Sequence, residues 1–188
     1  MMTETQVQEL VERTKQGDKD AFASLYEQYV DAIYRYVYFR VDADDAEDLV
    51  ETVFVKAWEK IAGYKQTKDN FSSWLFRVAH NLVVDHYRSR KTVEAITEEY
   101  QEYRAEYHPK IVTERGIESD LLQKALKGLK DDYQQVLVLK YINELSNKEI
   151  SALLDKSEGS LRILQFRALK ALKGVLEEMG MKQGSESG

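Results

Sequence analysis

The sequence predicts an all-α fold in which an acidic linker joins two small helical domains. Over most of the 188 residues, apolar side chains recur every three or four positions, which is the spacing of one helix face. Glycine occurs 9 times and proline once, too few for a turn-rich all-β protein. The length suits two small domains or one medium-sized domain.

Composition excludes several classes of function. The chain has no cysteine, so disulfides, thiolate metal sites and cysteine nucleophiles are excluded. No two of the 3 histidines stand at the i, i+4 spacing of zinc ligands on a helix, and we expect neither a metal nor a cofactor. No apolar run approaches the roughly 18 residues of a membrane span, and the N-terminus does not resemble a signal peptide. We therefore expect a cytosolic protein that does not insert into a membrane.

The first predicted domain, residues 1–91, reads as consecutive helices. We expect helices at about 4–16 and 19–39, a third that starts after the carboxylates at 42–45, and a fourth at about 72–90. The polar stretch 63–70 breaks the helical pattern and is predicted to be a loop.

Residues 92–118 form the predicted linker. They carry 7 acidic and 3 basic side chains and the only proline, Pro109, which ends any helix shortly before it. Apolar and aromatic side chains nevertheless recur at helical steps, at Val93, Ile96, Tyr100, Tyr103 and Tyr107. The pattern leaves a flexible tether and a tyrosine-striped amphipathic helix both open.

The second predicted domain, residues 119–180, ends in a helix-turn-helix, and residues 181–188 are predicted to be a disordered tail. Ser146 and Glu149 show the capping-box spacing at the start of a short helix. A turn at 155–157 separates that helix from a longer one expected at about 158–178. This last helix has four bases and one acid between residues 158 and 173. The cap, the turn length and the charge favour a recognition helix in a DNA major groove over a solvated bundle helix.

The net charge of −6 hides two oppositely charged segments. Residues 42–51 hold six carboxylates and no base, whereas residues 65–91 hold six bases and two carboxylates. Screening confines electrostatic fields to roughly 8–10 Å, so local patches decide contacts and an acidic total does not exclude nucleic acid. The acidic run lacks the glycine and the final glutamate of a calcium loop, and we interpret it as a helix edge offered to a basic protein.

The basic segment interleaves aromatic rings, cations and amides. Single-stranded nucleic acid is bound by such mixtures, in which cations follow phosphates while rings and loop pockets receive unstacked bases. The alternative is that rings such as Phe71 and Trp74 anchor the core, and for Trp74 the spacing favours this alternative because it falls with Leu75 and Val78 on the inward side.

Three ordered motifs resemble bacterial sigma factors. Residues 45–50 (DAEDLV), with Thr52, Phe54 and 56–58 (KAW), resemble the polymerase-binding helix of that family. A second set of residues resembles the adjoining promoter-melting helix of the family. The set consists of Phe71, 74–75 (WL), 77–79 (RVA), 81–82 (NL), Asp85 and Arg88. Residues 159–162 (GSLR) and 167–169 (RAL) resemble the recognition helix of the C-terminal domain. With two domains and a short linker, the chain is most similar to the extracytoplasmic-function (ECF) group.

The resemblance implies a non-catalytic factor that directs core RNA polymerase to specific promoters and initiates transcription. Its implied partners are bacterial core polymerase, promoter DNA as duplex and as melted nontemplate strand, and an anti-sigma factor. The acidic linker would occupy the channel later used by RNA. The implied polymerase-binding residues are Asp45, Glu47, Asp48, Glu51 and Lys56. The implied −10 contacts are Tyr64, Lys65, Lys68, Asn70, Phe71, Arg77, Asn81, Arg88, Arg90 and Lys91. The implied −35 contacts are Ser157, Ser160, Arg162, Gln165, Phe166, Arg167 and Lys170.

The recognition helix departs from the pattern of this family. In most relatives, the glycine that corresponds to Gly159 is followed by a run of the Thr/Ala-Val-Lys-Ser-Arg type. In this chain, residues 160–164 read SLRIL. We expect Ile163 and Phe166 on the outer face of the helix, where they meet either thymine methyl groups or a protein.

Two other functions stay open from the residues alone. A stand-alone helix-turn-helix regulator would use the N-terminal bundle as a sensor or dimerisation module and would bind its operator tightly without polymerase. An enzyme acting on nucleic acid would need a metal set, a nucleophile–base pair or a phosphate-binding glycine loop, and the sequence shows none of these.

Overall fold

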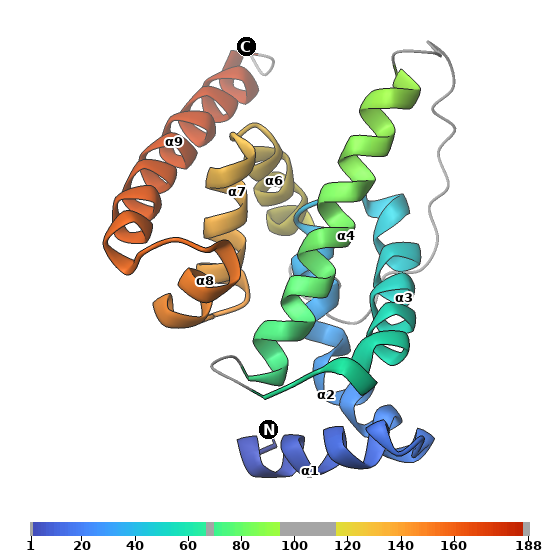
Figure 1. Ribbon diagram of the computed structural model, residues 1–188. Coiled ribbons are helices and arrows are strands. Elements are labelled where there is room, and N and C mark those ends of the chain that lie inside the picture. Colours follow the sequence, from blue (N-terminus) through green and yellow to red (C-terminus); the bar gives the residue numbers. More distant parts are fainter. Residues whose placement is uncertain (1, 67–69, 95–115, 186–188) are drawn as a thin grey trace. The chain divides into compact units, whose positions relative to one another are not determined.

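The computed structural model describes residues 2–66, 70–94 and 116–185, and every regular element in these ranges is a helix. The predicted all-α class is therefore confirmed. The chain divides into two compact units, Met1–Ala105 and Glu106–Gly188, which are described separately (Figure 1). The predicted linker with its tyrosine stripe lies almost wholly outside the described residues. Within the described ranges, no helix combines the length and the apolar character that crossing a membrane requires.

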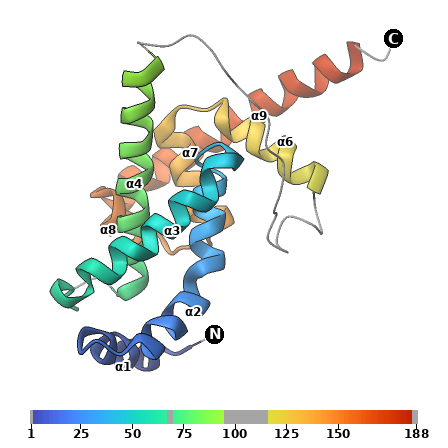
Figure 2. The same ribbon diagram turned by 90° about the vertical axis from the view of Figure 1, so that its right-hand side faces the viewer.

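The first unit is a bundle built around α2. Its elements are α1 (Glu4–Lys15), α2 (Lys19–Tyr38), α3 (Ala43–Lys60), the 3₁₀ turn η1 (Ile61–Gly63) and α4 (Phe71–Glu94). Helix α2 packs against α1, α3 and α4, and α3 crosses α4 obliquely (Figure 2). The core contains apolar side chains from all four of these α-helices, among them Val11, Leu25, Ile33, Val53, Ala57, Leu75 and Phe76. These are positions of the apolar faces, and their burial holds the bundle together.

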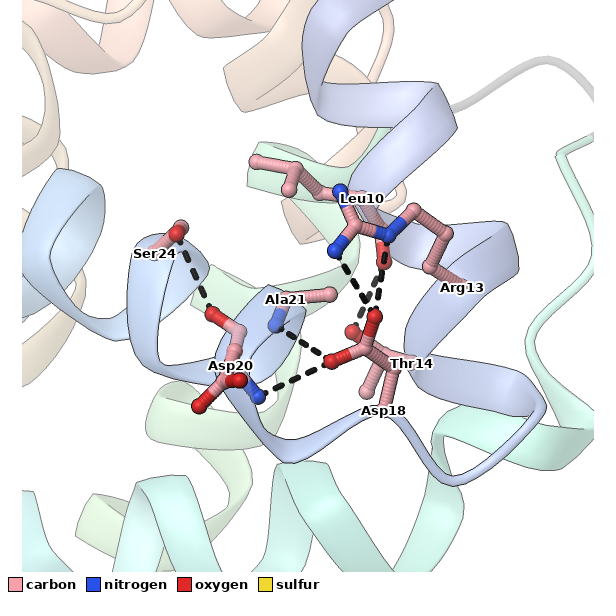
Figure 3. Close-up of polar contacts among 7 residues, drawn as sticks. All are labelled: Leu10, Arg13, Thr14, Asp18, Asp20, Ala21 and Ser24. Carbon is pink, nitrogen blue, oxygen red and sulfur yellow. Dashed lines mark hydrogen bonds and ion pairs between the residues drawn. The ribbon is translucent and has the colours of Figure 1, made fainter.

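A capped turn fixes the direction of α2 relative to α1 (Figure 3). Gly17 adopts a φ of +88°, a left-handed conformation that glycine reaches without a steric penalty. One carboxylate oxygen of Asp18 accepts hydrogen bonds from the N–H groups of Asp20 and Ala21, both at 3.0 Å. The other accepts from Nε and Nη2 of Arg13, at 2.9 and 2.8 Å. The bond from Ala21, followed by that from Arg13, lowers the pKa of Asp18 below its usual value, so this cap stays ionised at neutral pH.

The second unit packs its shorter helices against one long helix. Its elements are α6 (Gly116–Lys127), α7 (Asp131–Leu137), the π-helical turn η2 (Val138–Ile142), α8 (Asn147–Leu154) and α9 (Glu158–Ser185). Helix α9 contacts α6, α7 and α8. The shared core includes Leu126, Val136, Leu139, Ile150, Leu161 and Ala168, all of which are buried.

The predicted helix-turn-helix is present as α8, a three-residue turn and α9. The predicted capping box at its start is confirmed. Ser146 Oγ accepts from the Glu149 N–H at 3.2 Å, and the Glu149 carboxylate accepts from the Ser146 N–H at 2.8 Å. Asp155 then ends α8 in the left-handed region, with a φ of 51°, which Asp tolerates better than most residues.

One helix changes its type, and one predicted helix end is wrong. The helical stretch that begins with α7 changes to a π-helical turn at Val138, where the Asn143 N–H bonds to the Val138 carbonyl. A π-helical turn uses i→i+5 hydrogen bonds, is rare and is usually limited to a single turn. Helix α9 continues to Ser185 and so includes residues 181–185 of the tail predicted to be disordered. No proline follows to stop the helix, and an isolated glycine costs it only about 1 kcal/mol.

Candidate functional site

Helix α3 presents an acidic face. Asp48 and Glu51 are exposed, while Ala46, Val50 and Val53 are buried on the opposite side. Asp44 and Asp45 stand in the first turn, where the positive end of the helix dipole favours carboxylates. The six carboxylates of the acidic run are therefore not taken into the interior, and the acidic edge that the sequence predicts is present.

Two of the predicted polymerase-binding carboxylates have intramolecular neighbours. Asp45 is partly exposed, and its Oδ2 lies 3.4 Å from His86 Nε2 on α4, which connects the acidic helix to the basic one. Glu47 is half-buried near Tyr34. Burial, followed by the charge of Glu47, raises the pKa of Tyr34 to about 12, so this phenol stays neutral. Lys56 bonds Glu59 at 2.8 Å on the surface of the same helix.

The acidic face of α3 continues into an apolar one that was not predicted. Val55 is 56% exposed and Trp58 is 37% exposed, although Trp58 follows the buried Phe54 by four residues, the spacing of one helix face. The Trp58 ring packs edge-on against Phe22, with centroids 5.0 Å apart. The signal was available, because Val55 follows Asp48 by seven residues, which places both on one helix face.

The aromatic residues that flank the predicted −10 loop are buried, which corrects the prediction that they meet DNA. Tyr64 is 5% exposed and Phe71 is 4% exposed. The two rings contact each other, and both contact the half-buried Trp74, with centroids 5.2–5.7 Å apart. Phe71 also contacts Tyr29 of α2. Rings enclosed in this way support the loop and cannot stack on a base without leaving the cluster.

Asn70, predicted to read a base, caps α4 instead. Its Oδ1 accepts from the Ser73 N–H at 2.8 Å, which satisfies one of the unpaired donors at a helix start. Lys65 is exposed in the loop, and Lys68 lies outside the described residues.

One face of α4 collects the polar residues predicted to contact the −10 element. Arg77, Asn81 and Arg88 are spaced by four and seven residues, which places them on the same face. Asn81 and Arg88 are exposed, and Arg77 is half-exposed. The Arg88 guanidinium lies 3.8 Å from Asp85. Arg90 and Lys91 belong to α4, but their side chains lie outside the described residues.

Three residues predicted to meet the −35 element have structural contacts at the start of α9. Ser157 Oγ accepts from the Ser160 N–H at 3.2 Å and lies 2.9 Å from Ser160 Oγ, which caps the helix. Gln165 is only 9% exposed and donates to Asn147 Oδ1 at 3.1 Å. This burial corrects the prediction that Gln165 contacts DNA, because the side chain connects α9 to the first turn of α8.

The outer face of α9 is cationic with an apolar centre. Arg162, Arg167 and Lys170 are exposed, and Arg162 lies 3.8 Å from Glu158, one turn earlier. Ile163 and Phe166 are 56% and 70% exposed, which confirms their predicted outward orientation. In the part of the chain that the structure describes, no cluster of three or more side chains is suited to hold a metal ion.

Comparison with known proteins defines the class. Residues 25–93 match the family described as Sigma-70 region 2, and residues 119–172 match Sigma-70 region 4. The chain is thus a sigma factor that directs RNA polymerase to promoters, and a stand-alone regulator is not favoured. It is 30% identical over 187 residues to the ECF RNA polymerase sigma factor SigW of Bacillus subtilis, covering 94% of this chain and 100% of SigW. The chain therefore belongs to the ECF RNA polymerase sigma factors.

Another relative is similar to the chain in sequence, and two solved structures are similar to it in fold. The ECF sigma factor BldN of Streptomyces coelicolor is 35% identical over 173 residues, which is 90% of this chain but 66% of BldN. The fold matches CnrH in complex with the cytosolic domain of CnrY, with a TM-score of 0.69, 24% identity and coverage of 90% and 96% of the two chains. It also matches the sigma factor RpoE of Bartonella quintana in complex with the anti-sigma factor NepR, with a TM-score of 0.69, 23% identity and coverage of 83% and 96%.

Proposed function

We propose that three exposed surfaces of this sigma factor each bind a different partner during promoter recognition. The acidic face of α3 binds core polymerase, the polar face of α4 with the 64–70 loop binds the melted −10 element, and the outer face of α9 binds the −35 duplex. The observation that carries this assignment is the separation of charge between exposed carboxylates on α3 and exposed cations on α9. Residues 1–91 and 119–180 are accordingly two functional domains.

The α3 surface suits a basic protein surface with an apolar centre. Asp48 and Glu51 supply charge that steers association. Val55 and Trp58 supply apolar area next to that charge, and large exposed apolar side chains are typical of protein contacts. DNA would be repelled by this face, so a protein partner is favoured.

The −10 surface combines a supported loop with a polar helix face. Arg77 and Arg88 are placed to follow the backbone of a single strand, and Asn81 offers an amide that can read a base edge. The Tyr64–Phe71–Trp74 cluster brings together the two ends of the loop beside this face. The sequence of the same segment adds three bases, Lys68, Arg90 and Lys91.

The −35 surface uses the N-terminal half of α9. The second helix of a helix-turn-helix enters the major groove by this end. Arg162 stands there, in reach of base edges, and Arg167 and Lys170 add positive charge for the phosphates. Ser157 and Gln165 fix the helix at this position through the cap and the bond to Asn147.

Regulation by an anti-sigma factor is part of the proposal. The two solved relatives carry bound partners, the cytosolic domain of CnrY and the anti-sigma factor NepR. A protein inhibitor that covers the exposed apolar side chains of this chain would act in the same compartment as the polymerase, the cytoplasm. We assign no catalytic step to the sigma factor itself.

Run-off transcription with purified core polymerase tests this function. The full chain is expected to direct transcription from one class of promoters and to bind duplex DNA weakly on its own. Core polymerase without the chain serves as the control. Tight operator binding without polymerase, together with no stimulation of any promoter from the same genome, would contradict the proposal.

Replacing Arg162 with alanine separates base readout from phosphate contact. If Arg162 reads a base edge, the variant holoenzyme is expected to lose about 1–3 kcal/mol of binding free energy and to tolerate other bases at one −35 position. A phosphate contact would instead give a smaller loss of binding free energy that does not depend on the DNA sequence. It would also reduce the slope of the logarithm of affinity against the logarithm of salt concentration by about one. Salt-dependent binding to a set of −35 variants measures both quantities, and an unchanged affinity would show that Arg162 only faces solvent.

A further inference from the structure

The centre of the outer face of α9 is apolar although its surroundings are charged. Ile163 and Phe166 are separated by three residues and are therefore neighbours on one helix face. They are 56% and 70% exposed, and Arg162, Arg167 and Lys170 are exposed around them. Large apolar side chains next to each other on a surface indicate an interaction site.

The charges around this pair identify its partner as nucleic acid. Between residues 158 and 173, α9 carries four bases and one acid, and the acid, Glu158, lies 3.8 Å from Arg162. A cationic rim fits the phosphates on both sides of a major groove, and the pair lies in the half of the helix that enters the groove.

The chemistry of the major groove indicates which base this pair of side chains contacts. Thymine is the standard base that presents a methyl group there, and the other base edges present hydrogen-bond donors or acceptors. The Ile163 side chain cannot form hydrogen bonds. Against a polar base edge it would leave the donors or acceptors of that edge unpaired, whereas a methyl group makes an apolar contact with it. We propose that Ile163, with Phe166, reads the methyl group of a thymine in the −35 element. The inference rests on the proposed placement of α9 on that duplex.

Deoxyuridine in place of thymine tests the inference, because it removes the methyl group and leaves the hydrogen bonds of the base pair unchanged. Promoters that carry the preferred −35 element, with each thymine replaced in turn, are given to the reconstituted holoenzyme. At one position, the substitution is expected to lower open-complex formation about fourfold. Equal activity at every position, or a preferred element without any A·T pair, would overturn the inference.

Variants of Ile163 and Phe166 test whether these two side chains make the contact with the thymine methyl group. Ile163→Ser is expected to reduce the thymine-to-deoxyuridine ratio from about fourfold to about one, and Phe166→Ala to reduce it partly, while Ile163→Val keeps it. Leu176→Ala removes an exposed apolar side chain farther along the same helix and is expected to keep the full ratio. Circular dichroism confirms that each variant is folded.

Three outcomes separate a failure of this inference from a failure of the proposed function. If Ile163→Ser weakens core-polymerase binding and leaves the ratio at fourfold, the pair contacts protein and the inference is wrong. If the native holoenzyme initiates normally but does not distinguish the two bases, only the inference fails. Absence of promoter-directed initiation by the native holoenzyme would contradict the proposed function, and the inference with it.

Discussion

Reversing the charge of Asp48 with Asp48→Lys is expected to lower the affinity for core polymerase about 10- to 100-fold. The side chain is exposed at the middle of the acidic face of α3, so the variant should fold normally. A lysine there meets a basic partner surface with like charge, which costs several kcal/mol at close range and less where water screens it. Titration of labelled chain with core polymerase measures the affinity, and the difference between the native chain and the variant should shrink as salt is raised.

The matched control is Asp31→Lys, which makes the same charge change at an exposed position on α2. It is expected to leave the affinity within about threefold of the native value, because surface substitutions away from a contact have small effects. Binding of the isolated chain to duplex DNA should be the same for both variants. Equal polymerase affinity of the native chain and the Asp48 variant would remove the docking role from this face.

Local signals in the sequence predicted most of the helical elements. The Ser146–Glu149 cap is a pattern within four residues, and its two reciprocal hydrogen bonds form as expected. The outward position of Ile163 and Phe166 also follows from helical spacing alone. By contrast, no local pattern indicated the π-helical turn after α7, in which Val138 and Leu139 are buried.

The candidate contacts were harder to predict because residue type does not distinguish a surface ring from a buried one. Tyr64 and Phe71 are flanked by polar residues, yet they fold inward because Trp74 and, from α2, Tyr29 complete an aromatic cluster. Gln165 was assigned to the −35 element through the family resemblance, although it stands four residues after Leu161 and three before Ala168, both buried. Its position on the helix indicated burial more reliably than the resemblance indicated a contact.

Truncating Phe71 with Phe71→Ala is expected to lower the free energy of unfolding of the first unit by about 3–5 kcal/mol. The ring is 4% exposed and has centroids of Trp74 and Tyr29 at 5.4 and 5.6 Å, so its loss leaves a cavity between α2 and α4. Single domains have only about 5–15 kcal/mol of stability, and the variant should unfold at much lower urea. Tryptophan fluorescence follows this unit selectively, because both tryptophans, Trp58 and Trp74, belong to it.

The same chemical change at an exposed position provides the control for Phe71→Ala. Phe166→Ala removes a ring that is 70% exposed in the second unit, and circular dichroism should show a loss of less than about 0.5 kcal/mol. Phe71→Leu keeps an apolar side chain in the cluster and is expected to recover more than half of the stability. If Phe71→Ala unfolds at the same urea concentration as the native chain, the ring is not part of the packed core. The −10 loop would then lack the aromatic support that the proposed capture of an unstacked base requires.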